Sequence, residues 1–151
     1  MNLLMPCFLI CAAGPREHAI GFEEIYSAAL GGFDRETVIV SADERSFAEL
    51  WSQVMGFLID KPAAVPHVDF ENHLVLAYFP GVRPTLGYGF EVNGVSLLEG
   101  KRPALVLRVT ETPPGEVAAQ MISRPVIVLK LNRADGPPEW WKKGFKISIK
   151  K

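Results

Sequence analysis

The amino-acid sequence predicts a mainly β fold, an antiparallel β-sandwich or barrel-like domain that carries one α-helix at about residues 46–58. Two observations lead to this class. Short runs rich in β-branched and aromatic residues recur along the chain, and 13 glycines and 12 prolines separate them as turn residues. Between two of these runs lies a single stretch in which apolar residues recur at helical spacing.

Length and composition limit the possible classes of protein. The 151 residues suit one domain, and 48% hydrophobic with 22% charged residues is typical of a folded globule. Sixteen basic against 17 acidic residues leave a net charge of −1, which argues against a nucleic-acid partner. No run of 18 apolar residues is present, so no integral membrane span is expected. Two cysteines cannot form a disulfide framework or a four-thiolate zinc site.

The N-terminus has three interpretations. Residues 3–13 form an apolar run of the length of a signal-peptide core, with small residues before a cleavage point after Ala13 but no basic residue in front. Lipoprotein processing at Cys11 is a second interpretation. A buried first edge strand, interrupted by Pro6, is the third. We expect a single β-rich domain at 14–151, and export or a periplasmic location is favoured over the cytoplasm.

The elements follow in order after this segment. Residues 37–40 (TVIV) predict a strand, and Ser46 with Glu49 predicts a capping box at the start of the helix. The helical stripe that faces a core is expected to contain Phe47, Leu50, Trp51, Val54 and Leu58. Asp60-Lys61-Pro62 is expected to end the helix.

The rest of the chain predicts strands. Residues 73–79 (HLVLAYF) are almost continuously apolar, so this strand should be buried on both of its faces. Residues 87–98 alternate around Asn93-Gly94, which predicts a hairpin turn. Further strands are expected at 104–110, 126–131 and 145–149. The last should be an edge strand, because its outward lysines discourage edge pairing.

The sequence contains one candidate metal site. In an extended segment, four potential metal ligands would share one face: His67, Asp69, Glu71 and His73. They would then support a metal-dependent enzyme. The alternative is a solvated segment at the start of a strand, with Val68 and Phe70 pointing to the core. Because no catalytic motif is present, we expect neither an enzyme nor a bound cofactor.

The connection after residue 79 contains the most informative sequence. Pro84 fixes its own φ angle and Gly87 allows a positive φ, so residues 83–87 should form a stiff, exposed loop. A loop that is already rigid loses little entropy on binding. Arg83 and Tyr88 are residue types favoured at binding hot spots. Alternatively, this turn only sets strand register, with Tyr88 buried.

Residues 68–131 resemble the C-terminal domain of PrcB-type protease-complex subunits. The resemblance rests on V-D-F at 68–70, the buried strand that follows, R-P-T-x-G-Y at 83–88 and Pro125 before a hydrophobic strand. It implies a non-catalytic accessory domain that binds or stabilises a protease, often in exported proteins. The resemblance implies no catalytic residues in this sequence.

A fainter similarity is to chagasin-like inhibitors of papain-type cysteine proteases, which present three loops at one end of an immunoglobulin-like sandwich. Pro84, Thr85, Gly87 and Tyr88 match the first loop, Pro114-Gly115 stand at the middle loop, and Arg124-Pro125 match the third. Three positions depart from that pattern: Arg83 replaces Asn, Leu86 replaces the second Thr, and Val126 replaces Trp.

Together these observations predict a module that binds a protein partner such as a protease. We expect the loops to converge at one end of a sandwich. The candidate partner-binding residues are Arg83, Pro84, Thr85, Gly87, Tyr88, Pro114, Gly115, Arg124 and Pro125. The alternatives are a cysteine-protease inhibitor and the metal-dependent enzyme described above.

Overall fold

A computed structural model describes residues 14–56 and 64–151 of the chain. Its elements are β1 (Glu17–Ile20), β2 (Phe22–Ala28), β3 (Thr37–Ser41), α1 (Glu44–Met55), β4 (His73–Phe79), β5 (Gly89–Leu98), β6 (Ala104–Thr112), β7 (Val126–Asn132), the short 3-10 helix η1 (Arg133–Asp135), α2 (Pro138–Lys143) and β8 (Lys146–Lys150). The predicted signal peptide or first strand at 1–13 and the predicted helix end at Leu58 lie outside the described residues.

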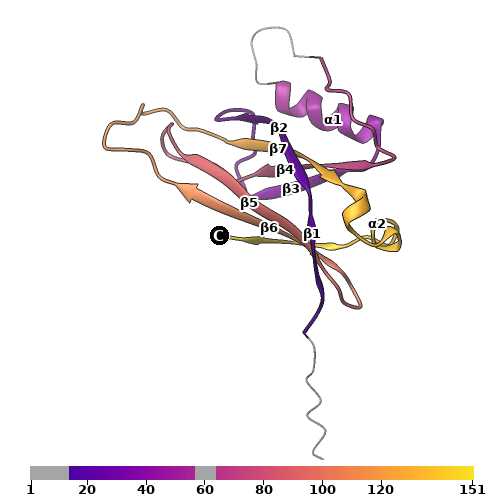
Figure 1. The fold of residues 1–151 in the computed structure, drawn as a ribbon. Coiled ribbons are helices and arrows are strands. Elements are labelled where there is room, and N and C mark those ends of the chain that lie inside the picture. The colour runs from indigo at the N-terminus through magenta and orange to yellow at the C-terminus, as the bar shows by residue number, and fades with distance from the viewer. Residues whose placement is uncertain (1–13, 57–63) are drawn as a thin grey trace, which may run out of the picture.

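The strands form two four-stranded sheets, in the orders β1-β5-β6-β8 and β2-β7-β4-β3. Figure 1 shows the two sheets stacked as layers, with α1 lying over the outer side of the β2-β7-β4-β3 sheet. The predicted mainly β class is confirmed, and the fold is a sandwich rather than a closed barrel. One apolar core fills the space between the sheets, and a second lies between α1 and the sheet beneath it.

Strand β4 is buried on both faces, as its apolar run predicts. Leu74, Leu76 and Tyr78 point into the core between the sheets. The alternate residues Val75, Ala77 and Phe79 belong to the core under α1. A strand read with period two can be apolar throughout only where both faces are covered, and the helix supplies the second cover.

Helix α1 begins two residues before the predicted start. Its N-cap is Asp43, whose Oδ1 accepts a hydrogen bond from the Ser46 backbone N at 2.8 Å. The prediction that Ser46 caps the helix was therefore wrong, because an aspartate three residues earlier takes that position. The buried stripe contains Phe47, Leu50, Trp51, Val54 and Met55. No helix among the described residues is long and apolar enough to cross a bilayer.

Two predicted strand features were also wrong. Asn93-Gly94 forms no hairpin turn, because β5 runs on to Leu98 and only shifts its register against β6 between Val92 and Gly94, as a β-bulge. The sandwich is not wholly antiparallel, because β8 pairs with β6 in parallel. Strand β8 nevertheless lies at a sheet edge, as its alternating lysines indicate.

Candidate functional site

Three loops converge at one end of the sandwich. The first loop (29–36) joins β2 to β3, the second loop (80–88) joins β4 to β5, and the third loop (113–125) joins β6 to β7. Figure 1 shows the third loop, in orange, projecting from this end. Arg83 and Ser123 form an isolated antiparallel bridge, with N–O distances of 2.9 and 3.0 Å in its two directions. The predicted convergence of the second and third loops is therefore confirmed.

Backbone hydrogen bonds tie the first loop to both of the others. Gly32 N donates to Arg124 O at 2.8 Å, and Arg124 N donates to Ala29 O at 2.9 Å. Val82 N donates to Asp34 O at 3.0 Å. Because these bonds link backbone groups, they hold the loops in one arrangement whatever the side chains contact.

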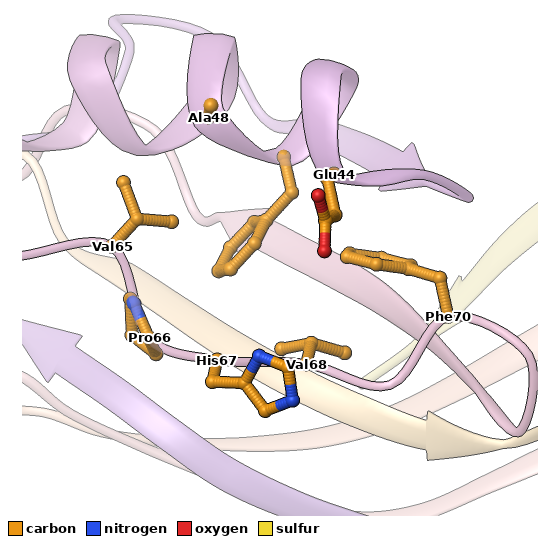
Figure 2. Close-up of a pocket in the computed structure, with 8 residues that line it drawn as sticks. Glu44, Ala48, Val65, Pro66, His67, Val68 and Phe70 are labelled. Atoms are coloured by element: carbon orange, nitrogen blue, oxygen red, sulfur yellow. The ribbon is translucent and has the colours of Figure 1, made fainter.

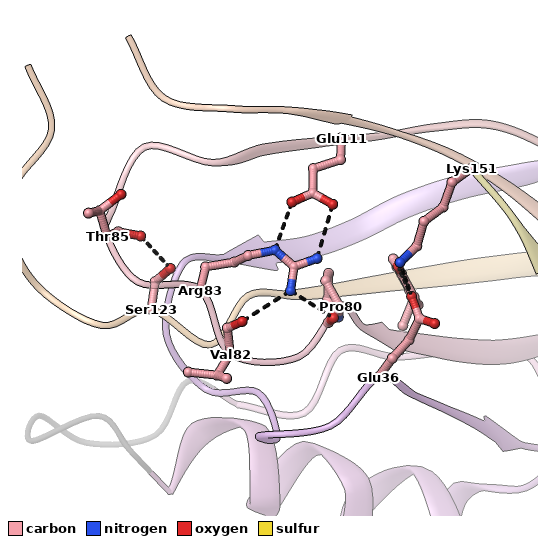
Figure 3. A network of polar contacts seen from close by, with 9 residues as sticks. Glu36, Pro80, Val82, Arg83, Thr85, Glu111, Ser123 and Lys151 are labelled. Atoms are coloured by element: carbon pink, nitrogen blue, oxygen red, sulfur yellow. Dashed lines mark hydrogen bonds and ion pairs between the residues drawn. The ribbon is translucent and has the colours of Figure 1, made fainter. Parts of the chain in front are cut away.

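The Arg83 side chain forms its hydrogen bonds with other residues of the domain, at the end of the sandwich where the loops converge. Its Nε and Nη2 donate to Glu111 Oε1 and Oε2 at 2.7 and 3.0 Å, and its guanidinium lies 5.4 Å from the Phe90 ring centre. Nη1 also donates to the backbone oxygens of Pro80 and Val82 (Figure 3). With 17% of this side chain exposed, its donors are satisfied within the domain. Arg83 therefore fastens the second loop to the end of β6.

A second acidic group lies beside this pair. Glu36 accepts a hydrogen bond from the Tyr78 hydroxyl at 2.9 Å. It accepts another from Lys151 Nζ, also at 2.9 Å (Figure 3). Burial opposes ionisation of Glu36, but these two bonds outweigh it and lower its pKa. The bond from Arg83 likewise lowers the pKa of Glu111. Both lowered pKa values favour the ionised carboxylate at the end of the sandwich where the loops converge.

Several predicted contact residues lie at the surface. Pro84, Gly87 and Gly115 are exposed. Gly87 has a positive φ of 92°, as predicted, and Pro114 lies directly against it, 3.0 Å from where a Cβ would stand. Tyr88 is half-buried. The Pro114-Gly115 turn thus joins the same loop cluster.

Other predicted contact residues face the interior or are already paired. Pro125 is buried, so its side chain does not reach the surface. Arg124 forms an ion pair with Asp34 across the first and third loops. The Thr85 carbonyl accepts a hydrogen bond from Ser123 Oγ at 2.8 Å, while the Thr85 hydroxyl is buried without a partner among the described residues.

The sequence reasoning missed an apolar surface on the same three loops. Nine large apolar side chains among the described residues are exposed, and six of them lie on these loops: Leu30, Phe33, Val82, Val117, Met121 and Ile122. We call these six residues the loop patch. Val117 is 96% exposed. The signal was present in the sequence, because 117–122 is rich in apolar residues yet lies between turn residues and has no strand periodicity.

The predicted metal-binding face does not exist. Residues 70–72 form a turn, in which the backbone N atoms of Asn72 and His73 both donate to Asp69 O. The segment is therefore not extended, and alternate side chains do not share a face. Among residues 14–56 and 64–151, no group of three or more His, Cys, Asp or Glu side chains is arranged to hold a metal ion.

A hollow of about 300 Å³ lies between α1 and residues 65–70 (Figure 2). Phe47, Val65, Val68 and Phe70 give it a mainly apolar lining. Of the four proposed ligands only His67 borders it, and Glu44 supplies the single carboxylate. This hollow therefore does not assemble the predicted metal site.

Residues 74–132 match the family model described as PrcB C-terminal. The resemblance inferred from the sequence over 68–131 is confirmed in this segment. The matched segment spans β4, β5, β6 and β7, which are the two central strands of each sheet, together with the second and third loops. No curated protein and no solved structure matches the chain.

Proposed function

We propose that this protein, whose residues 74–132 match the PrcB C-terminal family model, is a non-catalytic protein-binding module that acts as an accessory or stabilising subunit of a protease. The convergence of three hydrogen-bonded loops that expose the loop patch carries this proposal. Large apolar side chains exposed together on one set of loops are a feature of protein interaction sites. A surface already rigid before binding also loses little entropy when a partner docks.

The roles of the predicted residues divide into two groups in this proposal. Arg83, Arg124 and Ser123 hold the loops together through side-chain and backbone bonds. The partner would contact the loop patch and the exposed Pro84 and Gly115 beside it. A few residues buried at the centre of an interface contribute most of its binding energy.

Affinity capture from the native host tests the proposal. The full chain should retain a protease, identified by mass spectrometry, and Met121→Asp should retain much less of it. Val65→Asp is the matched control, because Val65 is 47% exposed and Met121 46%, but Val65 lies beside α1, away from the three loops. Equal capture by both variants, or capture of no protease, would contradict the proposal.

A cysteine-protease inhibitor is the second candidate, because the three inhibitor-like segments lie in the second and third loops, which the Arg83–Ser123 bridge joins. The two candidates differ in what binding does to the enzyme. An accessory subunit should leave the captured protease active and lengthen its half-life at elevated temperature. An inhibitor should abolish the activity of a papain-type protease in proportion to the amount of chain added. Both effects can be measured with one fluorogenic peptide assay.

A further inference from the structure

Strand β3 has an unpaired edge that differs from the other sheet edges. Four strands end the two sheets: β1 and β8 in one, β2 and β3 in the other. The first three carry charged side chains, among them Glu17 on β1, Glu23 on β2 and Lys146 on β8. Strand β3 reads TVIVS and carries none. Charges on edge strands prevent unwanted pairing, so among the strands of residues 14–56 and 64–151 β3 is the one edge without this protection.

The β3 sequence is self-complementary around Ile39. In an antiparallel pair centred on this residue, residues equally distant from it lie opposite one another. Val38 then faces Val40 of a second copy, and Thr37 faces Ser41. Each is a favourable cross-strand pair, β-branched with β-branched and hydroxyl with hydroxyl.

The flanking charges agree with the same register. Arg35 and Asp43 each stand four residues from Ile39, on opposite sides of it. Both are exposed, and within the described residues Arg35 makes no ion pair. Antiparallel pairing would bring Arg35 of each copy towards Asp43 of the other, so opposite charges would meet at both ends of the strand.

We propose that two copies of this chain associate by antiparallel pairing of their β3 edges, with Ile39 at the two-fold axis. The two four-stranded sheets that contain β3 then join into one continuous sheet. Because the strands run in opposite directions, the loop patches of the two copies point away from each other and stay free for other partners. A two-fold interface of this kind uses the same surface of both subunits.

Sedimentation equilibrium of the full chain over a range of concentrations tests the proposal. We expect a concentration-dependent rise from 16.7 kDa to twice that mass. Because the two-fold axis doubles the effect of each substitution, Arg35→Glu should raise the Kd of the dimer about tenfold. Ile39→Lys, which sets two like charges face to face, should abolish it. Arg102→Glu, the same charge change at the exposed β5–β6 turn, should leave the Kd unchanged.

A disulfide reports the register directly and does not depend on the stability of Ile39→Lys. In a chain with Cys7→Ser and Cys11→Ser, Ile39→Cys should oxidise to a covalent dimer, because facing residues in antiparallel strands lie within disulfide reach. Ser52→Cys, on exposed α1, should crosslink far more slowly. A chain that stays monomeric at every concentration overturns the proposal, as does a dimer that Arg35→Glu and Ile39→Lys leave intact. Loss of protease capture by Ile39→Lys in a monomeric chain would instead assign the edge to a strand of the protease.

Discussion

The Arg83 guanidinium binds the Glu111 carboxylate through two hydrogen bonds, of 2.7 and 3.0 Å, across 28 residues of sequence. This pair joins the second loop to the far end of β6. Both side chains are mostly buried, with 17% and 28% exposed. A bidentate pair in such surroundings constrains geometry as well as adding stability. It explains how the second loop, which carries Val82 of the loop patch, keeps one conformation.

Removing one member of this pair should destabilise the fold. We expect Arg83→Ala to lower the free energy of unfolding by about 1.5–3 kcal/mol, because it leaves the Glu111 carboxylate without its main donor. Arg83→Lys should recover only part of this loss, since an ammonium cannot form the bidentate pair. Urea denaturation of both variants measures the difference.

A double-mutant cycle separates this pair from its surroundings. Arg83→Ala combined with Glu111→Ala should cost less than the sum of the two single changes, because the second change removes the stranded charge. Additive losses would show that the two side chains stabilise the fold independently.

The carboxylates at this end of the sandwich should make stability depend on pH. The pKa values of Glu36 and Glu111 are lowered from the ordinary 4.5 in the folded state. Their stabilisation is therefore complete above 4.5 and is lost as the pH falls through the lower folded values. Glu111→Gln should reduce the free energy of unfolding at pH 7, and the difference from the wild type should shrink in acid. An exposed control, Glu116→Gln, should run parallel to the wild type throughout the denaturation series.

The parts of the fold that were predictable depend on local pattern. Strand β4 could be recognised because both of its faces are covered, so its seven residues are nearly all apolar. Strands β1 and β2 were not recognised, because as edge strands they carry charges such as Glu17 and Glu23. The parallel pairing of β8 with β6 joins segments far apart in the sequence, so no local pattern predicts it.

Some features of the candidate site were also predictable from the local sequence, and others were not. Proline and glycine identified the second loop, and the positive φ of Gly87 follows from its residue type. Two features depend on how the loops meet, which sequence spacing does not reveal. Arg83 forms an ion pair with Glu111, and Pro125 is buried. The loop patch was not predicted, because the apolar residues at 117–122 have no periodicity that tells which of them face solvent.

The N-cap residue of α1 can be tested by mutation, because the sequence pattern predicts Ser46 and the structure shows Asp43. Asp43→Ala should cost about 1 kcal/mol of stability, because the Ser46 backbone N loses its acceptor. Asp43→Asn should cost much less, since asparagine also accepts at this position. Ser46→Ala should cost less than Asp43→Ala, whereas a cap at Ser46 would require the reverse order. Thermal or urea unfolding of the three variants decides between them.

Gly32 and Gly115 form a matched pair for testing whether loop convergence supports binding. A Cβ on Gly32 would stand 2.8 Å from Arg124 O and closer still to Pro125 O, so Gly32→Ala must push the first and third loops apart. A Cβ on Gly115 meets nothing within 4 Å, and its φ is not in the left-handed region. Gly115→Ala should therefore leave stability unchanged or raise it slightly, by restricting the unfolded chain.

If the three loops bind as one unit, Gly32→Ala should weaken protease capture although its side chain adds no charge and reaches no surface. Gly115→Ala adds one methyl group at the surface without displacing a loop, so it should weaken protease capture less than Gly32→Ala does. Capture assays should be run at a temperature where circular dichroism shows both variants folded, so that a loss reflects the loop arrangement. Undiminished capture by folded Gly32→Ala would mean that the partner recognises the loops separately, because their mutual hydrogen bonds would then be dispensable for binding.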